Sequence, residues 1–393
     1  MQADPRPVYL WQQPGWPQLQ VDTAALSGAL QAARQRQGEV LGLAQALGMP
    51  TIDAVLQELW VSEAAATAAI EGERLDLAAL RSSVMRRLGQ GGASGPVSRS
   101  VEGLVEVMQD ALAGFDQPLD DDRLCRWQSA LFPGGTSGIR RIAVGRYRDH
   151  ADPMQIVSGR PGHEVVHYQA PASAEVPREM ARFLSWFEAT RPGRGAASSS
   201  RHAADGLNRA AIAHLWFETI HPFEDGNGRI GRAIADMALA QDLGAPTRLY
   251  SLSAQLLASR GAYYDALNQA QKGQTEVTAW VRWFADALAQ ACARTTGIML
   301  SALHKQRFWA AHAATPLNER QRKVVQKLLD AGDGGFLGGL SADKYVKMTG
   351  TSKATATRDL ASLLQHGLLR AQGSGKATRY QVNVPEWAHA GAG

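Results

Sequence analysis

Apolar and polar residues alternate with the period of an α-helix along most of the 393-residue chain. The predicted helices span about 23–47, 51–71, 98–114, 120–132 and 176–190. A largely helical block then extends to about residue 310. Because β-type runs are short and few, the pattern predicts a mainly α-helical protein.

Two of these short β-type runs, Met154–Ser158 and Glu164–Tyr168, flank a Ser-Gly-Arg-Pro-Gly segment and predict a β-hairpin at 154–168. The hairpin contains HEVVH at 163–167, which matches a zinc-protease pattern when it lies on a helix. In an extended strand the two histidines are about 13 Å apart, too far for one zinc ion. The strand prediction therefore disfavours a zinc site.

After Pro316 the pattern changes again. Helices are predicted at about 318–331, 341–349 and 352–366, and two strands around a Gly-Ser-Gly-Lys turn. Three helices followed by a hairpin are typical of a winged helix. The third helix begins with residues suited to DNA, namely Ser352, Lys353, Thr355, Thr357 and Arg358. The alternative is a solvated helix face in a regulatory or protein-binding module.

Composition narrows the class of protein. A hydrophobic fraction of 45% and a length of 393 residues predict a folded chain of two or three domains. The net charge of +4 is compatible with phosphate-bearing ligands without demanding nucleic acid. Two separated cysteines, Cys125 and Cys292, argue against a disulfide framework. With no apolar run of the ~18 residues that a membrane span needs, we expect a cytoplasmic protein.

The stretch HPFEDGNGRIGR at 221–232 combines turn-forming and charged residues. Pro222 disfavours helix at His221, and helical periodicity resumes after the glycines. Gly226 and Gly228 permit a tight turn and close backbone approach. The N–H groups of the turn and of the new helix therefore predict a concave anion site.

The charged residues of this stretch suggest which anion is bound. Arg229 and Arg232 are neighbours on one helix face and can hold successive phosphates. Asp225 alone would repel phosphate, so its presence suggests a bridging Mg²⁺. His221 is placed to take a proton from an attacking hydroxyl. The alternative is a polar turn with ordinary surface arginines.

The stretch resembles the signature of the Fic family, His-x-Phe-x-(Asp/Glu)-Gly-Asn-Gly-Arg-x-x-Arg. Every fixed position is matched: His221, Phe223, Asp225, Gly226, Asn227, Gly228, Arg229 and Arg232. The similarity extends over about 60–300 and includes VGRYRDH before the hairpin and YYDALNQAQKG at 263–273. It implies a Fic-type helical core with a β-hairpin flap, followed here by the winged helix.

The resemblance implies a protein adenylyltransferase, which moves AMP from ATP to a Ser, Thr or Tyr hydroxyl of a target protein or of itself. His221 would activate the hydroxyl as a base. Asp225 would hold Mg²⁺ on the α- and β-phosphates. Arg229 would bind phosphates and steady the leaving pyrophosphate, and Arg232 would bind the γ-phosphate.

The resemblance also implies supporting roles. Asn227 and the backbone around Gly226 and Gly228 would cradle phosphates. Phe223 would anchor the loop in the core. Tyr264 falls where the family has aromatic contacts near the adenine.

A second stretch, TAAIEG at 67–72, is similar to the inhibitory-helix motif of Fic proteins, (Ser/Thr)-x-x-x-Glu-(Gly/Asn). Thr67, Glu71 and Gly72 match it. The resemblance implies that Glu71 pairs with Arg232 and occupies the space of the γ-phosphate, which makes the enzyme self-inhibited. The alternative is a solvent-facing Glu before a glycine that ends the helix.

Together these features predict three regions. They are an N-terminal arm and helical region at 1–95 with the inhibitory helix at about 51–72, a Fic catalytic core at 96–310, and a winged-helix-like domain at 316–393. The flap at 154–168 would bind a target protein by strand addition, the winged helix could bind DNA, and a homo-oligomer is a further expectation. Two alternatives stay open: a nucleotide-sensing, DNA-binding transcriptional regulator, and a Fic enzyme that removes AMP or transfers another phosphate-containing group.

Overall fold

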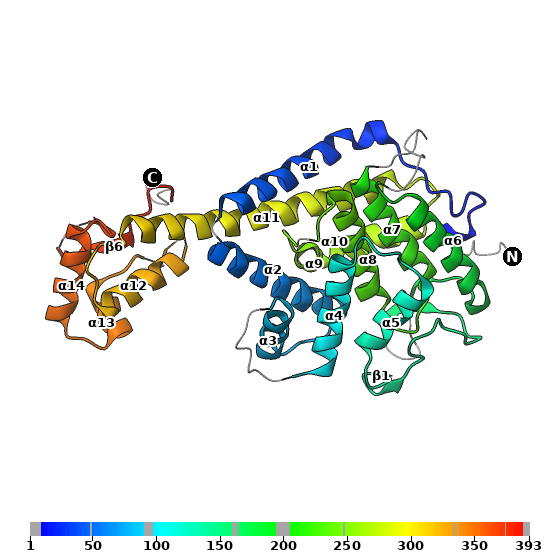
Figure 1. The fold of residues 1–393 in the computed structure, drawn as a ribbon, viewed down its shortest axis with the longest axis horizontal. Helices are drawn as coiled ribbons and strands as arrows, with labels where there is room; N and C mark the ends of the chain where they lie inside the picture. Colours follow the sequence, from blue (N-terminus) through cyan, green and yellow to red (C-terminus); the bar gives the residue numbers. More distant parts are fainter. Residues whose placement is uncertain are drawn as a thin grey trace. The chain divides into compact units, whose positions relative to one another are not determined.

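The structure is a computed structural model that describes most of the chain. The described residues are 9–47, 49–89, 97–158, 163, 165–193, 205–246, 248–332, 335–336, 338–373 and 375–387. They are mainly helical, with short strands that pair two by two (Figure 1). This confirms the predicted fold class. In these ranges we find no helix with the length and apolar character that crossing a membrane requires.

The chain divides into two compact units, Met1–Ala46 with Asp53–Thr296 and Leu47–Ile52 with Gly297–Gly393. The helices up to the end of the first unit are α1 Thr23–Ala46, α2 Met49–Ile70, α3 Leu77–Arg87, α4 Arg99–Ala113, α5 Asp121–Leu131, α6 Val176–Ala189, α7 Gly206–Ile220, α8 Asn227–Leu243, α9 Leu252–Ala258, α10 Arg260–Gln271 and α11 Thr278–Ala311. The five helices predicted individually before residue 190 are present, and each bound lies within two residues of its prediction.

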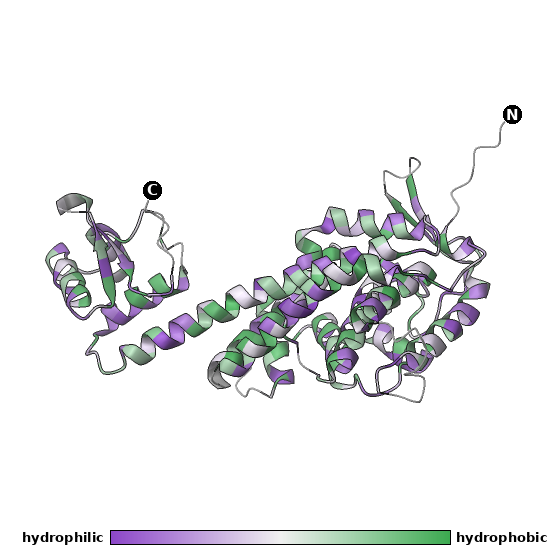
Figure 2. Ribbon diagram, turned by 90° about the horizontal axis from the view of Figure 1, so that it is seen from above, coloured by the Kyte–Doolittle hydropathy of each residue, from purple (hydrophilic) through white to green (hydrophobic). Residues whose placement is uncertain are grey.

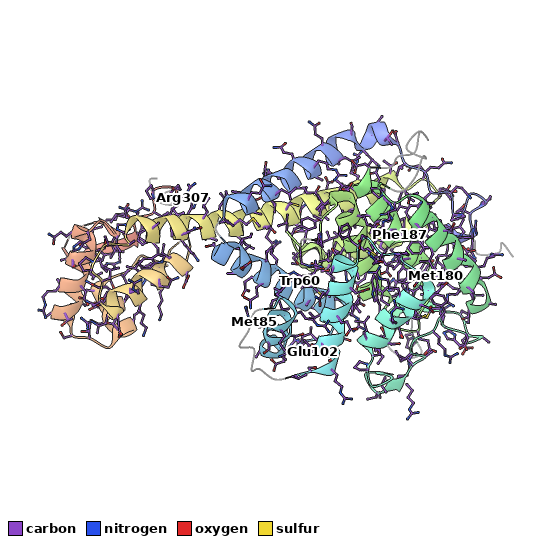
Figure 3. All side chains as sticks on the ribbon, in the orientation of Figure 1. Trp60, Met85, Glu102, Met180, Phe187 and Arg307 are labelled. Carbon is purple, nitrogen blue, oxygen red and sulfur yellow. The ribbon has the colours of Figure 1, made fainter. Side chains whose placement is uncertain are left out.

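Helices α7 and α8 form the centre of the first unit, packed against each other (Figure 1). Every residue of α7 is buried, as are nearly all residues of α8. A helix that is buried all round lies inside the core of a protein. Helix α6 packs on α7, where its buried Met180 and Phe187 (Figure 3) belong to the core. The loop between α7 and α8, which carries HPFEDGNGRIGR, is therefore fixed by two core helices.

The predicted hairpin is formed by β3 (Gln155–Ser158) and β4 (Val165–Gln169), which pair antiparallel with a register shift between Ile156 and Val157. The turn residues 159–162 and Glu164 lie outside the described residues. His167 lies on a strand, as the prediction for this half of HEVVH requires. A second, smaller pair joins β1 (Thr136–Ser137) to β2 (Arg140–Arg141).

The second unit has its own hydrophobic core. Its elements are α12 Glu319–Asp330, α13 Ala342–Thr349, α14 Lys353–Gln365, β5 Leu369–Gln372 and β6 Arg379–Val382. Strands β5 and β6 pair antiparallel, and Leu340 bridges to Tyr380. Three helices followed by a hairpin are the elements predicted for this region.

The division of the chain differs from the three predicted regions. The expected boundary near 95 falls inside one compact unit, because α3 and α4 pack together across it. The second unit begins at Gly297, earlier than the predicted 316. The reason is that α11 continues without a break and contributes the buried Phe308 to the C-terminal core. Hydrophilic and hydrophobic residues are interspersed along the whole of α11 (Figure 2), so its sequence pattern gives no sign of the boundary.

Candidate active site

His221 ends α7 in an unusual backbone conformation. Its φ of 51° and ψ of 60° are left-handed, and among the described residues it is the one non-glycine with positive φ. A left-handed residue of this kind costs about 1–3 kcal/mol, so the surroundings must hold it. The prediction that the helix ends at His221 is confirmed.

Arg148, from the VGRYRDH segment, stabilises this backbone conformation through several hydrogen bonds. Its Nε donates to the His221 carbonyl at 2.9 Å, and its Nη2 donates to the carbonyls of Pro171 and Ile220 at 2.6 and 3.2 Å. Its backbone N–H donates to the Pro222 carbonyl at 2.9 Å. Burial lowers the pKa of the Arg148 guanidinium to about 10, so it stays charged at neutral pH.

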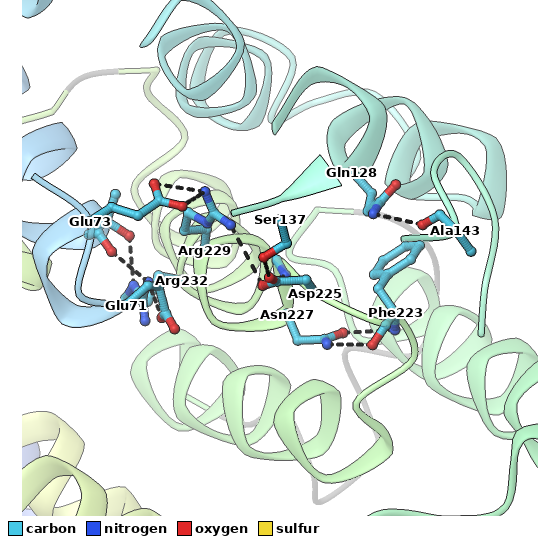
Figure 4. A network of polar contacts seen from close by, with 12 residues as sticks. Glu71, Glu73, Gln128, Ser137, Ala143, Phe223, Asp225, Asn227, Arg229 and Arg232 are labelled. Atoms are coloured by element: carbon cyan, nitrogen blue, oxygen red, sulfur yellow. Dashed lines mark hydrogen bonds and ion pairs between the residues drawn. The ribbon is translucent and has the colours of Figure 1, made fainter. Parts of the chain in front are cut away.

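Asn227 and Phe223 close the loop. The Asn227 side chain accepts from the Phe223 N–H at 2.9 Å and donates to the Phe223 carbonyl at 2.8 Å (Figure 4). The Phe223 ring is fully buried, which confirms its predicted place in the core. The Asn227 side chain therefore holds the backbone of Phe223, and its second amide N–H and its main chain are left for the predicted phosphate cradle.

The N-terminus of α8 is the predicted anion site, and Glu71 lies on it. No side chain among the described residues caps this helix end, whose first N–H groups lack partners within the helix. A Cβ added at Gly228 would lie 2.2 Å from Glu71 Oε1. Gly228 therefore provides the space in which the Glu71 carboxylate sits.

Arg232 is held by the two residues predicted to inhibit it. Its Nη2 donates to Glu71 Oε1 at 2.7 Å and to the Thr67 carbonyl at 2.9 Å, and its Nε donates to Thr67 Oγ1 at 2.7 Å (Figure 4). The Arg232 side chain is only 3% exposed. Gly72, with φ of 82°, follows the end of α2. The structure thus brings together Thr67, Glu71 and Arg232, although 161 or more residues separate each partner from Arg232.

Helix α2 is anchored to the core two turns before Glu71. Glu63 Oε2 accepts from Ser251 Oγ at 2.8 Å and from the Ser253 N–H at 3.0 Å, and it lies 3.5 Å from Arg248. The Arg248 guanidinium stacks 5.1 Å from the ring of Trp60, which is labelled on α2 in Figure 3. These buried contacts fix the helix that carries the inhibitory residues.

Arg229 has a carboxylate partner that the sequence did not predict. Its Nη1 contacts both carboxylate oxygens of Glu73, at 3.0 and 3.1 Å, and its guanidinium stacks 4.8 Å from the ring of Phe132. Glu73 lies just beyond the end of α2, so helical periodicity could not link it to the site. Both arginines of the signature are therefore paired with acids from one short segment.

Asp225 is the predicted ligand for Mg²⁺. Its Oδ2 accepts from Ser137 Oγ, its Oδ1 accepts from the Gly226 N–H at 2.6 Å, and the carboxylate lies 3.7 Å from Arg229 Nη2. The described residues hold no cluster of three or more acidic, His or Cys ligands. One partly exposed carboxylate beside an anion site nevertheless fits Mg²⁺, which takes one or two carboxylates and completes its shell with phosphate oxygens and water.

His221 is a buried, neutral imidazole. Burial and, to a smaller extent, the charge of Arg148 lower its pKa to about 4, against the opposing effect of Glu71. At neutral pH the ring can therefore accept a proton. Its Nδ1 lies 3.7 Å from Oε2 of Glu218, a second residue that the sequence did not single out.

Tyr264, on α10, is placed beside the inhibitory segment. Its hydroxyl donates to the carbonyl of Ile70, the last residue of α2, at 3.2 Å. The ring is 40% exposed and lies 5.6 Å from the Arg260 guanidinium. A half-exposed ring near the anion site is compatible with the predicted adenine contact, which stays a prediction.

Comparison with known proteins shows which family this part of the chain is similar to. Residues 118–239 match the Fic/DOC family. The chain contains a Fic domain. Residues 9–90, which carry Thr67, Glu71 and Gly72, match a domain of unknown function (DUF4172).

The Fic domain has curated relatives. The chain is 28% identical over 155 residues to protein adenylyltransferase fic-1 of Caenorhabditis briggsae, covering 39% of this chain and 27% of the relative. It is 27% identical over 221 residues to protein adenylyltransferase Fic of Drosophila ananassae, covering 56% of this chain and 38% of the relative. The chain thus matches well under half the length of each.

The fold is also similar to a solved structure. This is a Fic domain containing signaling protein from Bacteroides thetaiotaomicron, with a TM-score of 0.50 and 17% identity, covering 69% of this chain and 96% of that one. At this identity the likeness supports the Fic fold and carries nothing about the substrate.

Proposed function

We propose that the protein is a self-inhibited protein adenylyltransferase, which transfers AMP from ATP to a Ser, Thr or Tyr hydroxyl. The observation that carries this proposal is the arrangement around the α8 N-terminus. A neutral base (His221), a carboxylate (Asp225) and two buried arginines (Arg229 and Arg232) surround a helix end suited to phosphate. The names of the relatives agree with this activity.

In the proposed reaction the hydroxyl oxygen of the target attacks the α-phosphorus of ATP. A bond forms between that oxygen and phosphorus, the bond to the bridging oxygen breaks, and its electron pair leaves with pyrophosphate. The hydroxyl proton goes to His221. Arg229 and Arg232 hold the phosphates in line for this displacement and balance the charge on the leaving group.

Asp225 is the residue that would hold Mg²⁺ next to these phosphates. The metal would supply neutralisation of the phosphate charge. The Ser137 hydroxyl and the Gly226 N–H fix the orientation of the Asp225 carboxylate.

Self-inhibition follows from competition for Arg232. Glu71 forms a 2.7 Å contact with its guanidinium and sits on the first turn of α8, so it takes both the partner and the place proposed for the γ-phosphate. A nucleotide that binds beside Glu71 would have its α-phosphate out of line, and small misplacements can cost about 100-fold in rate.

The hairpin is proposed to hold the target. Its strands present exposed apolar side chains, those of Ile156, Val157, Val165 and Val166. Within the described residues the sheet has two strands, so an extended target segment could add to an edge by main-chain hydrogen bonds.

Labelling with ATP tests the proposal. Purified Glu71→Gly protein, incubated with Mg²⁺ and ATP labelled at the α-phosphate, should incorporate about 100-fold more label than wild type. Glu58→Ala, which removes an exposed carboxylate from the same helix, should behave as wild type. Absence of label on the protein itself and on any lysate protein would refute the transferase.

A second candidate function rests on charge. Residues 297–393 contain thirteen Lys and Arg against six Asp and Glu, a formal charge of +7 in a chain whose total is +4. Such an excess of positive charge favours binding of nucleic acid.

At the start of α14, Arg358 is exposed, whereas Lys353 is paired with Asp343 at 2.9 Å. A gel shift with and without ATP checks this candidate, and loss of salt-sensitive DNA binding in Arg358→Ala would support it.

A further inference from the structure

Glu218 lies directly behind His221, on the last turn of α7. Its Oε2 is 3.7 Å from His221 Nδ1, and its side chain is 6% exposed. Among the described residues, no side chain hydrogen-bonds His221 Nδ1, and Glu218 Oε1 has no hydrogen-bond partner. Buried polar atoms without partners are rare and commonly mark functional sites. The second carboxylate oxygen, Oε2, faces His221 Nδ1 beside the proposed reaction centre.

The surroundings keep space for this carboxyl group. A Cβ added at Gly231 would lie 2.5 Å from Glu218 Oε1, so a side chain at that position would displace it. The backbone carbonyl of Glu218 accepts a hydrogen bond from Gln271 Nε2 at 3.1 Å. A hydrogen bond to the Glu218 backbone also raises the pKa of His221, so the carboxyl group is a second part of Glu218 beside the imidazole.

We propose that Glu218 is a positioning residue, which holds His221 in the tautomer that carries its proton on Nδ1. The inference rests on the proposed transferase activity. An ionised Glu218 accepts the Nδ1–H, which leaves the Nε2 lone pair free for the hydroxyl proton of the target. After the transfer both ring nitrogens carry protons, and the carboxylate stabilises the imidazolium without taking a proton itself.

The charged groups around the pair set when Glu218 is ionised. Burial raises its pKa to about 8, Arg232 lowers it and Glu71 raises it. Two further neighbours of Glu218, His214 and Tyr263, are hydrogen-bonded to each other and neutral. Burial lowers the pKa of His214 to about 4 and raises the pKa of Tyr263.

The protonation state of Glu218 decides the tautomer. A protonated Glu218 can donate its O–H to Nδ1, which favours the tautomer with the imidazole proton on Nε2 and so removes the base. Because Glu218 ionises above its raised pKa, transfer should increase as the pH rises through about 8. Arg148 and Asp225 act on His221 itself, whose pKa of about 4 lies well below this range.

Kinetics in the Glu71→Gly background test the role. Glu218→Gln should lower kcat about 100-fold, leave the KM for ATP within about twofold, and remove the rise of kcat near pH 8. Glu218→Asp should retain that rise. Glu179→Gln, which alters another buried Glu far along the chain on α6, should change neither kcat nor the pH profile.

Two outcomes have different meanings. If Glu71→Gly protein transfers AMP and Glu218→Gln leaves kcat and the pH profile intact, the role of Glu218 is overturned and the transferase stands. If no variant transfers AMP, the proposed function fails, and the tautomer of His221 is then measured without an activity assay. Nitrogen-15 NMR of wild type at pH 9, with His221 signals identified by their loss in His221→Ala, should show the proton on Nδ1; a proton on Nε2 overturns the inference.

Discussion

The two ends of the candidate active site differ in how well their charges are paired. At the phosphate end, Arg232 is paired with Glu71 and Arg229 with Glu73, both within 3.1 Å. At the base end, His221 Nδ1 and Glu218 Oε1 are buried and no side chain among the described residues hydrogen-bonds either atom. The comparison indicates that the proposed inhibition acts at the phosphate end of the site, whereas the base end is governed by the protonation of Glu218 and His221.

The largest expected effect is at the base end. His221→Ala, in the Glu71→Gly background, should lower AMP transfer about 1,000-fold and leave ATP binding unchanged, because the imidazole is needed for proton transfer alone. Labelling measures the first quantity and calorimetric titration the second. The exposed His150, changed to Ala, is the control. Undiminished transfer by His221→Ala would show that the base lies elsewhere.

A smaller effect is expected when ATP is added to the phosphate end. With Glu71 removed, Arg232 is free, and ATP·Mg²⁺ at about 100 times its Kd should stabilise the protein by about 2.7 kcal/mol. Wild type at the same concentration should be stabilised less, since ATP must first displace Glu71. Thermal unfolding with and without ATP measures both shifts. Equal shifts would mean that Glu71 does not compete with nucleotide.

The smallest effect should come from Glu73. The Glu73 side chain is 44% exposed, and exposed ion pairs contribute about 0.2–1 kcal/mol. Glu73→Gln added to Glu71→Gly should therefore lower the KM for ATP by at most about fivefold, with kcat unchanged. Glu106→Gln, which removes a similarly exposed partner of Arg87, is the matched control. A KM that rises would reveal that Glu73 helps nucleotide binding.

The sequence predicted the parts of the site that are encoded locally. The helix end at His221, the buried anchor Phe223 and the pairing of Glu71 with Arg232 all follow from short motifs. The two hydrogen bonds between Arg232 and Thr67 were not predicted. The sequence did not predict that the side chain of Asn227 bonds the backbone of Phe223, and its place in the phosphate cradle stays a prediction. Sequence spacing predicts that Asn227 is the first residue of a helix, but it does not show which way the side chain of that residue points.

The remaining contacts depend on packing between distant segments. Glu73 is 156 residues from Arg229, and Arg148 is 73 residues from His221. Neither pair has a period or a motif that links its members. Glu218 is close in sequence to His221, yet its burial, on which its proposed role depends, results from the packing of α7 against α8 and cannot be read from the sequence. The domain boundary inside α11 was missed for a similar reason, because the helix continues through it.

The contacts of Thr67 have a consequence for activation. Thr67 and Glu71 are one helical turn apart, and Thr67 already holds Arg232 through two hydrogen bonds. In the proposed inhibition Glu71 would therefore compete as a tethered ligand, whose effective concentration is roughly millimolar or higher and does not fall on dilution. Loosening the last turn of α2 would lower that concentration without any change at the nucleotide site. A partner that unwinds those few residues would thus act as an activator while leaving every catalytic side chain untouched.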